Sequence, residues 1–283
     1  MSGRMQHNLV VRGRRLALAL AVAGVTTPLG ASAWADSRVL FIGNSITYTN
    51  QLPLLIQQMR NADGHVGDFS YTMVANSGWS LLNHWNDSGP ASAHWALANA
   101  GTYDDVVLQD FSSNPVLVPD QTRTYSRLWH SEILSCDPAA TTIMFSTWQR
   151  QDYPNSQGIN DSVYGGLAAE FGGWCFVPGD AWLTVTQQRP DIPLYVDYVH
   201  PTLAGSYLAA AVFYSQFYHN SPIGLAGPAG LSSDTARYLQ TVAWQTVGTA
   251  VWNPVVTSGQ WNVPGNWDFG TPAAAQAVSL EQS

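Results

Sequence analysis

The sequence predicts an α/β fold, a three-layer α/β/α sandwich with a mostly parallel central sheet. Two patterns support this fold class. Short apolar runs that end at glycine or polar residues alternate with longer segments whose apolar residues recur at helical spacing. The chain also has 283 residues, 46% of them hydrophobic, which is enough for one sizeable core. Strands separated by helices pair in parallel, and the helices then cover both faces of the sheet.

The apolar runs predict five strands, and the segments between and after them predict helices. The strands are 38–42, 69–75, 105–108, 141–146 and 174–177. The helices are 52–60, 91–100, 121–134, 161–171, 180–188, 203–217 and 235–249. In a sheet of this kind, binding and catalytic groups lie at the carboxyl ends of the strands. We therefore expect the functional side chains in the loops that follow them.

The first 35 residues have the layout of a secretory signal peptide. Four arginines (Arg4, Arg12, Arg14 and Arg15) precede an apolar run over 16–30, and small residues follow at 31–35. The run is shorter than the ~20 residues that span a bilayer, although an uncleaved anchor is the alternative. We predict a secreted or periplasmic protein, with attachment to the cell surface as an alternative, and no stable membrane insertion after cleavage.

The rest of the chain divides into an α/β domain, 36–222, and a C-terminal part, 223–283. The C-terminal part begins with Gly, Pro and Ala and continues into the predicted helix 235–249. Its last segment, 258–272, is rich in Trp, Asn, Gly and Pro. This segment resembles one copy of a Trp-rich repeat of bacterial surface proteins, or it is a terminal segment packed on the domain or disordered.

Composition excludes several kinds of function. All 11 basic residues are arginines, so Schiff-base chemistry on lysine and a phosphate-binding loop lysine are absent. The formal net charge of −8 argues against nucleic acid as a partner. The histidines and cysteines lack the spacing of a metal site.

The two cysteines leave two alternatives open. In an oxidising compartment outside the cytoplasm, Cys136 and Cys175 would form one disulfide. The other possibility is a pair of buried free thiols, because sequence alone does not give the distance between them.

A candidate nucleophile follows the first predicted strand. Ser45 stands in the sequence Gly-Asn-Ser-Ile-Thr (43–47), between an apolar run and a helical segment. A serine at this position lies beside free backbone N–H groups, which favour the negative charge of an oxyanion. The alternative is a serine that only caps a helix.

A candidate general base lies near the end of the predicted α/β domain. Asp197 precedes His200 by three residues, and Pro201 restricts the backbone that follows. A histidine serves as base for a serine when an acidic group holds its ring and tautomer, and Asp197 is close enough to do so. The alternative is a surface loop with an unrelated histidine.

Together these segments resemble the SGNH (GDSL-like) hydrolases. The resemblance covers about 39–222 and includes Asn76-Ser77-Gly78, the stretch 104–109, Thr147-Trp148 and 200–208. Asn44 stands where the family usually has Asp, and the third motif lacks the usual Gly-x-Asn-Asp.

The resemblance implies an esterase with Ser45 as nucleophile, His200 as base and Asp197 as the residue that orients it, without metal or cofactor. The oxyanion would be bound by the N–H groups of Ser45 and Gly78 and by the amide of Gln109 or Asn114.

The substrate class is suggested by tryptophans near the predicted strand ends. Trp79 and Trp148 are candidate substrate-binding residues because aromatic faces stack on sugar rings, or they pack in the protein interior. We expect a small-molecule or polysaccharide ester as substrate, with O-acetyl groups on carbohydrate as the first candidate. The alternatives are a non-catalytic secreted glycan-binding or surface protein and a lipase or thioesterase for longer acyl chains.

Overall fold

The computed structural model describes residues 37–64, 69–248, 250–251 and 278–279. The predicted signal peptide and the Trp-rich segment 258–272 lie outside these ranges. The expected export, which depends on the signal peptide, therefore stays a prediction. Among the described residues, no helix has the length and apolar character needed to cross a membrane.

Five parallel strands form the central sheet, in the order β2-β1-β3-β4-β5. They are β1 (Ser37–Gly43), β2 (Phe69–Ala75), β3 (Asp105–Leu108), β4 (Thr141–Phe145) and β5 (Trp174–Phe176). All five agree with the predicted strands to within one residue at each end. Because β1 lies between β2 and β3, the loops that follow these three strands meet at one edge of the sheet.

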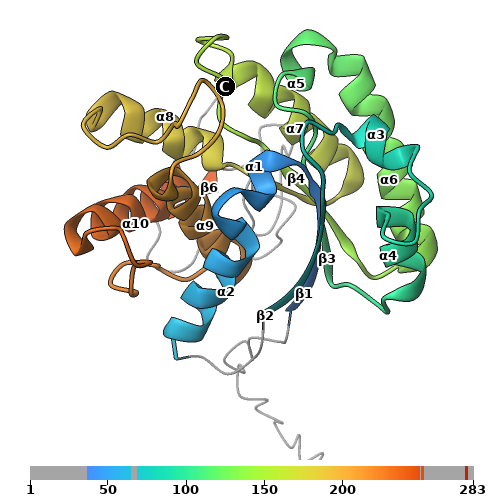
Figure 1. Ribbon diagram of the computed structural model, residues 1–283, viewed down its shortest axis with the longest axis horizontal. Coiled ribbons are helices and arrows are strands. Elements are labelled where there is room, and N and C mark those ends of the chain that lie inside the picture. The colour runs from blue at the N-terminus through green and yellow to red at the C-terminus, as the bar shows by residue number, and fades with distance from the viewer. Residues whose placement is uncertain (1–36, 65–68, 249, 252–277, 280–283) are drawn as a thin grey trace, which may run out of the picture. The chain divides into compact units, whose positions relative to one another are not determined.

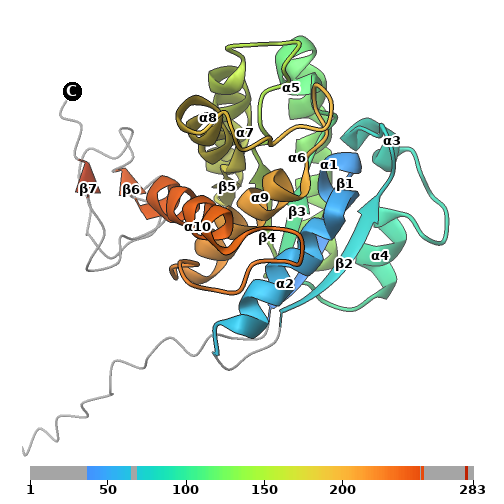
Figure 2. The same cartoon turned by 60° about the vertical axis from the view of Figure 1, so that its left-hand side comes forward.

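Helices cover both faces of the sheet (Figures 1 and 2). One face packs against α2 (Leu52–Ala62), α8 (Pro178–Gln188), α9 (Leu203–Tyr218) and α10 (Ser233–Gly248). The other packs against α3 (Leu81–Trp85), α4 (Ala93–Asn99), α6 (Pro119–Cys136) and α7 (Gln157–Phe171). Alternate residues of β1 enter opposite cores: Phe41 joins the first and Leu40 the second. The predicted three-layer α/β/α sandwich is confirmed.

Among the described residues, four short helices were not predicted. They are α1 (Ser45–Tyr48), the 3₁₀ helix η1 (Thr49–Gln51), α3 and α5 (Asn114–Leu117). Each has only three to five residues, too few for apolar spacing to reveal a helix. Capping side chains define two of them instead, since Asn44 begins α1 and Ser80 begins α3.

Helix α10 belongs to the same core as α9. The Gln240 amide donates hydrogen bonds to the Tyr207 hydroxyl (2.6 Å) and to the Leu225 carbonyl (2.8 Å). Leu239 and Ala243 are fully buried in the core that contains α9. The predicted C-terminal part therefore begins with a helix that completes the α/β unit. Beyond it, β6 (Ala250–Val251) pairs in parallel with β7 (Val278–Ser279).

Both cysteines are free thiols. Cys136 is the last residue of α6 and is exposed, whereas Cys175 lies within β5. Burial raises the pKa of both thiols, so neither is a ready nucleophile. The disulfide is wrong, and so is the burial of both free thiols, because Cys136 is exposed.

Candidate active site

The first strand delivers Ser45 to the start of a helix. Asn44 caps α1, because its side-chain oxygen accepts a hydrogen bond from the Ile46 N–H (3.1 Å). Ser45 is then the first residue of α1, with 9% of its surface exposed. A helix start presents unpaired N–H groups, so negative charge is favoured beside this hydroxyl.

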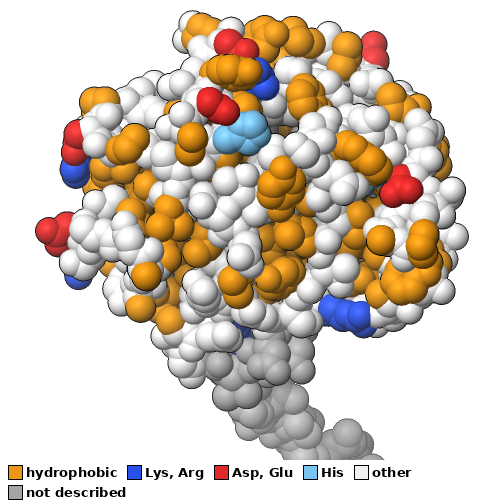
Figure 3. All heavy atoms as spheres, viewed as in Figure 1, with side chains coloured by type: hydrophobic (Ala, Val, Ile, Leu, Met, Phe, Trp, Pro, Cys, Tyr) orange, Lys and Arg blue, Asp and Glu red, His pale blue; other side chains and the backbone are white. Residues whose placement is uncertain are grey.

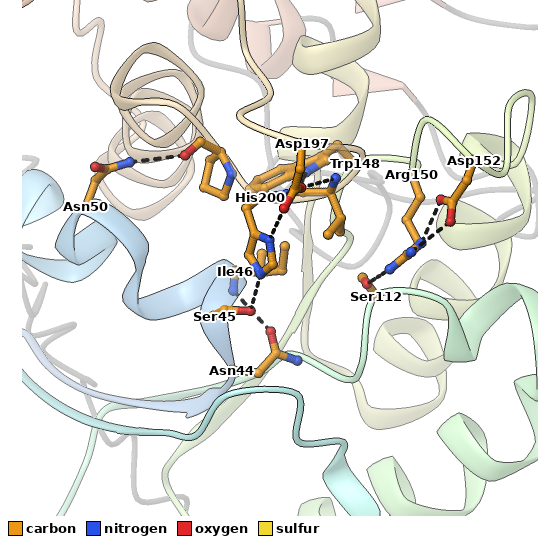
Figure 4. A network of polar contacts seen from close by, with 12 residues as sticks. Asn44, Ser45, Ile46, Asn50, Ser112, Trp148, Arg150, Asp152, Asp197 and His200 are labelled. Carbon is orange, nitrogen blue, oxygen red and sulfur yellow. Dashed lines mark hydrogen bonds and ion pairs between the residues drawn. The ribbon is translucent and has the colours of Figure 1, made fainter.

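His200 and Asp197 form a hydrogen-bonded chain with Ser45 (Figure 4). His200 Nε2 lies 2.9 Å from Ser45 Oγ, and His200 Nδ1 lies 2.8 Å from Asp197 Oδ2. The carboxylate fixes the proton on Nδ1, which leaves the Nε2 lone pair facing the serine hydroxyl. The structure thus brings together the three side chains that the sequence indicated.

Asp197 is held in its ionised form. Its Oδ1 accepts hydrogen bonds from the N–H groups of Val199 and His200, each at 2.7 Å. Together with the His200 ring, these donors lower the pKa of Asp197 to about 2. The carboxylate therefore stays negative over the range in which esterases work, and orients the imidazole throughout.

The loop that carries both residues is a narrow turn. Tyr195 and Pro201 form an antiparallel bridge, and the Val196 N–H donates to the His200 carbonyl at 2.9 Å. Trp148 supports the loop from inside: its Nε1 donates to the Val199 carbonyl at 2.9 Å, and its ring stacks on Trp182 with centroids 3.8 Å apart.

Trp148 is only 1% exposed, so the prediction that it binds substrate is wrong. It supports the loop that carries Asp197 and His200 from inside. The sequence around Trp148 did not show whether its side chain is buried or exposed.

Asn44 also joins the three loops at the edge of the sheet. Its amide donates to the Trp79 carbonyl (2.8 Å) after β2 and to the Asp110 carbonyl (3.3 Å) after β3. The fully buried ring of His84 lies beneath, with Nε2 donating to the Gly43 carbonyl at 2.7 Å. Burial lowers the pKa of His84 and keeps it neutral. Sequence reasoning missed both roles, although an Asn directly before a helix is a recognisable cap.

Gln109 does not reach the site. Its side-chain oxygen accepts from the Asn44 N–H and the Thr47 hydroxyl, each at 3.0 Å, and its amide nitrogen donates to the Asp110 carbonyl. The side chain has no exposed surface. The prediction that it donates to an oxyanion is therefore wrong, because its oxygen holds the loop after β1 and its nitrogen bonds the Asp110 carbonyl after β3.

The two backbone N–H groups expected to bind an oxyanion are those of Ser45, at the start of α1, and Gly78, in the loop after β2. Neither Ser45 N nor Gly78 N has a hydrogen-bond partner among the described residues, and the exposed Gly78 has a φ of 71°, which favours glycine. The Asn114 amide instead lies 3.3 Å from Asp110 Oδ1 and from Gln121 Oε1. The half-buried Trp79 follows Gly78 directly, so a substrate contact at this residue stays a prediction.

Solved structures share this arrangement of strands and helices, whereas no family model and no curated protein matches the sequence. A DUF4886 family protein from Bacteroides uniformis superposes with a TM-score of 0.61 at 18% identity, covering 75% of this chain and 95% of that one. A candidate SGNH hydrolase from Slackia heliotrinireducens gives 0.53 at 22% identity, covering 64% and 98%. The chain has the SGNH-hydrolase fold. The family resemblance noted in the sequence is therefore confirmed for the fold.

In this SGNH fold, a strained segment after Ser45 is hydrogen-bonded to the chain that follows His200. Asn50 and Gln51 both have a φ of 53°, a left-handed conformation that is uncommon outside glycine. The Asn50 amide donates to the Ser206 hydroxyl (3.0 Å) and to the Pro201 carbonyl (3.4 Å), next to His200 (Figure 4). These hydrogen bonds stabilise the strained backbone of Asn50. They connect η1 with Pro201 and with the start of α9.

Arg150 lies on the other side of the catalytic loop. Its guanidinium forms two hydrogen bonds with Asp152 and a third with Ser112 in the loop after β3 (Figure 4). The face seen in Figure 3 carries few charged side chains, and a histidine lies beside acidic groups near its upper edge. Sequence reasoning missed Arg150, because nothing in its neighbourhood in the chain distinguishes it from a surface arginine.

Proposed function

We propose that this protein is a serine esterase that hydrolyses carboxylic esters through an acyl-serine intermediate. The observation that supports this most directly is the hydrogen-bonded chain from Ser45 Oγ through the His200 ring to Asp197. A serine next to a base that is itself oriented by a carboxylate is the arrangement that activates a hydroxyl.

The geometry supports a two-stage reaction. Ser45 Oγ attacks the ester carbonyl while its proton moves to His200 Nε2, and the oxyanion is bound by the N–H groups of Ser45 and Gly78. When the intermediate collapses, His200 returns that proton to the departing alcohol. A water molecule then gives a proton to His200 and attacks the acyl-serine. When this second intermediate collapses, His200 passes the proton to Ser45 Oγ and the acid is released.

We further propose that the substrate is an O-acetylated carbohydrate outside the cytoplasm. The signal-peptide pattern of residues 1–35 supports export. The half-buried Trp79 directly after Gly78 supports a sugar or other ring-bearing ester near the oxyanion donors.

The test is hydrolysis of p-nitrophenyl acetate by the mature protein and by Ser45→Ala, with labelling by a fluorophosphonate. We expect Ser45→Ala to lose at least about a thousandfold in kcat and all labelling. Ser113→Ala is the matched control, because Ser113 is also buried (8% exposed) but lies outside the chain to His200. Folded protein that neither hydrolyses esters nor takes the label would favour the glycan-binding alternative. A preference for long acyl esters would favour a lipase or thioesterase.

A further inference from the structure

Tyr198 lies exposed within the catalytic loop, between Asp197 and His200. Its surface is 54% exposed, although the residue is aromatic and the loop around it is tightly bonded. Val196, on the same turn, is 72% exposed. Two exposed apolar side chains directly beside a catalytic histidine form a surface that could contact a substrate.

The Tyr198 ring is held in a defined place. The Arg150 guanidinium carbon lies 5.0 Å from the ring centroid, within the range of a cation–π contact. Arg150 is itself fixed by Asp152 (2.8 and 2.9 Å) and Ser112 (3.1 Å), and its side chain is only 12% exposed. The ring therefore rests on an immobilised cation, and little conformational entropy is lost when a ligand binds to it.

The backbone beneath the ring is equally constrained. The Gln151 N–H donates to the Tyr198 carbonyl at 2.9 Å, and Trp148 Nε1 donates to the next carbonyl, that of Val199, at 2.9 Å. An exposed ring that is fixed through both its backbone and its face is preorganised, unlike a flexible surface tyrosine.

The chemistry of the reaction decides which part of an ester would meet this ring. His200 must protonate the oxygen of the departing alcohol, so the alcohol part of the ester lies on the side of His200. The acyl carbonyl lies on the side of Ser45 and Gly78, whose N–H groups bind its oxygen. Tyr198 is two residues before His200 in the same turn, on the alcohol side, and its ring lies against Arg150.

We infer that Tyr198, supported by Arg150, is a subsite for the sugar ring of an acetylated carbohydrate. The flat apolar face of a fixed tyrosine matches the C–H face of a pyranose ring, whereas an acetyl group has no such face. This inference rests on the proposed esterase function and names the part of the substrate that gives it selectivity.

The test compares two acetates with different alcohols, glucose pentaacetate and ethyl acetate, by titration of the released acid. Tyr198→Ala lowers the ratio of kcat/KM for the sugar acetate over ethyl acetate by about tenfold, through KM, which is the scale of one aromatic contact. Tyr198→Phe and Tyr198→Trp keep the ratio, because they keep the ring.

The chain contains a matched control. Arg189 lies over the Tyr238 ring at 5.1 Å and is paired with Asp191, so this pair repeats the arrangement away from the catalytic loop. Tyr238→Ala leaves the ratio unchanged. An unchanged ratio in Tyr198→Ala or an equal loss on both acetates would overturn the inference. Ethyl hexanoate, a longer acyl ester, is measured alongside, and a loss confined to it would also overturn the inference.

A binding measurement separates this inference from the proposed function. Ser45→Ala should bind unacetylated xylotriose or cellotriose in titration calorimetry, and Ser45→Ala/Tyr198→Ala should not. Failure of the esterase proposal appears instead as absence of Ser45-dependent hydrolysis of ethyl acetate. Ester hydrolysis with no binding of either sugar overturns the subsite and leaves the esterase standing.

Discussion

Replacing Asn44 by Asp restores the residue that SGNH hydrolases usually have at this position, yet we expect it to damage this protein. The substitution keeps the shape and changes only the amide nitrogen into an oxygen. In this structure that nitrogen donates to two carbonyls, those of Trp79 (2.8 Å) and Asp110 (3.3 Å). A carboxylate would face both oxygens with no proton to offer, in a position that is 2% exposed.

The Asp110 carbonyl keeps the Gln109 amide as a donor, so the Trp79 carbonyl is the acceptor that loses its bond to Asn44 without that replacement. Losing this bond costs about 1–3 kcal/mol, and the buried charge beside two carbonyl oxygens brings the total to about 2–4 kcal/mol. Burial and the absent donors raise the pKa of the new carboxyl, and the protonated form regains one donor. When the pKa of a carboxyl is raised in the folded state, the free energy of unfolding falls as pH rises. The variant's loss of stability relative to the wild type is therefore small near pH 4 and largest above neutrality.

Thermal unfolding at pH 4 and pH 8 measures this difference. At pH 8 we expect the Asn44→Asp variant to melt roughly 5–15 °C below the wild type, with a smaller gap at pH 4. Asn44→Ser is the control, because serine keeps the helix cap without adding a charge. Equal stability of the Asp variant and wild type at pH 8, with full activity, would refute the assignment of the Asn44 amide.

Three other predictions follow from the same contacts. Asp197→Asn lets an amide donate to His200 Nδ1 and reverses the tautomer, so p-nitrophenyl acetate hydrolysis should fall at least about a hundredfold while the melting temperature changes little; full activity would contradict this. Trp148→Phe leaves the Val199 carbonyl unpaired and should lower stability by about 1–3 kcal/mol in urea titration, whereas an unchanged midpoint would count against the bond. Burial and a neighbouring carboxylate raise the pKa of Asp180 to about 7, so its contribution to stability declines as pH rises from about 4 to 7. The melting temperature of Asp180→Asn should therefore fall less between pH 4 and pH 7 than that of the wild type. The same fall in both proteins would show that Asp180 is not its cause.

The central sheet could be predicted almost completely from the sequence. The strand β3 matches its predicted bounds, because a strand buried on both faces is a short apolar run between polar residues. The edge strand β2 also matches, although only Phe69 and Val74 are buried in it. The short helices α1 and α5 could not be predicted in the same way. Their positions depend on caps and on neighbouring loops, which contribute little to local hydrophobic periodicity.

The triad candidates could also be found from the sequence, because each lies in a short local pattern. Ser45 follows a strand, and Asp197 precedes His200 by three residues in the same loop. Their mutual distance depends on the fold alone, since 155 residues separate Ser45 from His200.

The surrounding roles were decided only by tertiary structure. Gln109 and Trp148 have the residue types of an oxyanion donor and a sugar platform, yet both are buried and hold loops in place. Tyr198 had no such signal but lies exposed in the same turn as His200. The sequence by itself determined the order of strands and helices and the reactive groups, because these depend on local patterns. Only the tertiary structure decided which polar and aromatic side chains face solvent, because burial depends on what distant segments pack against them.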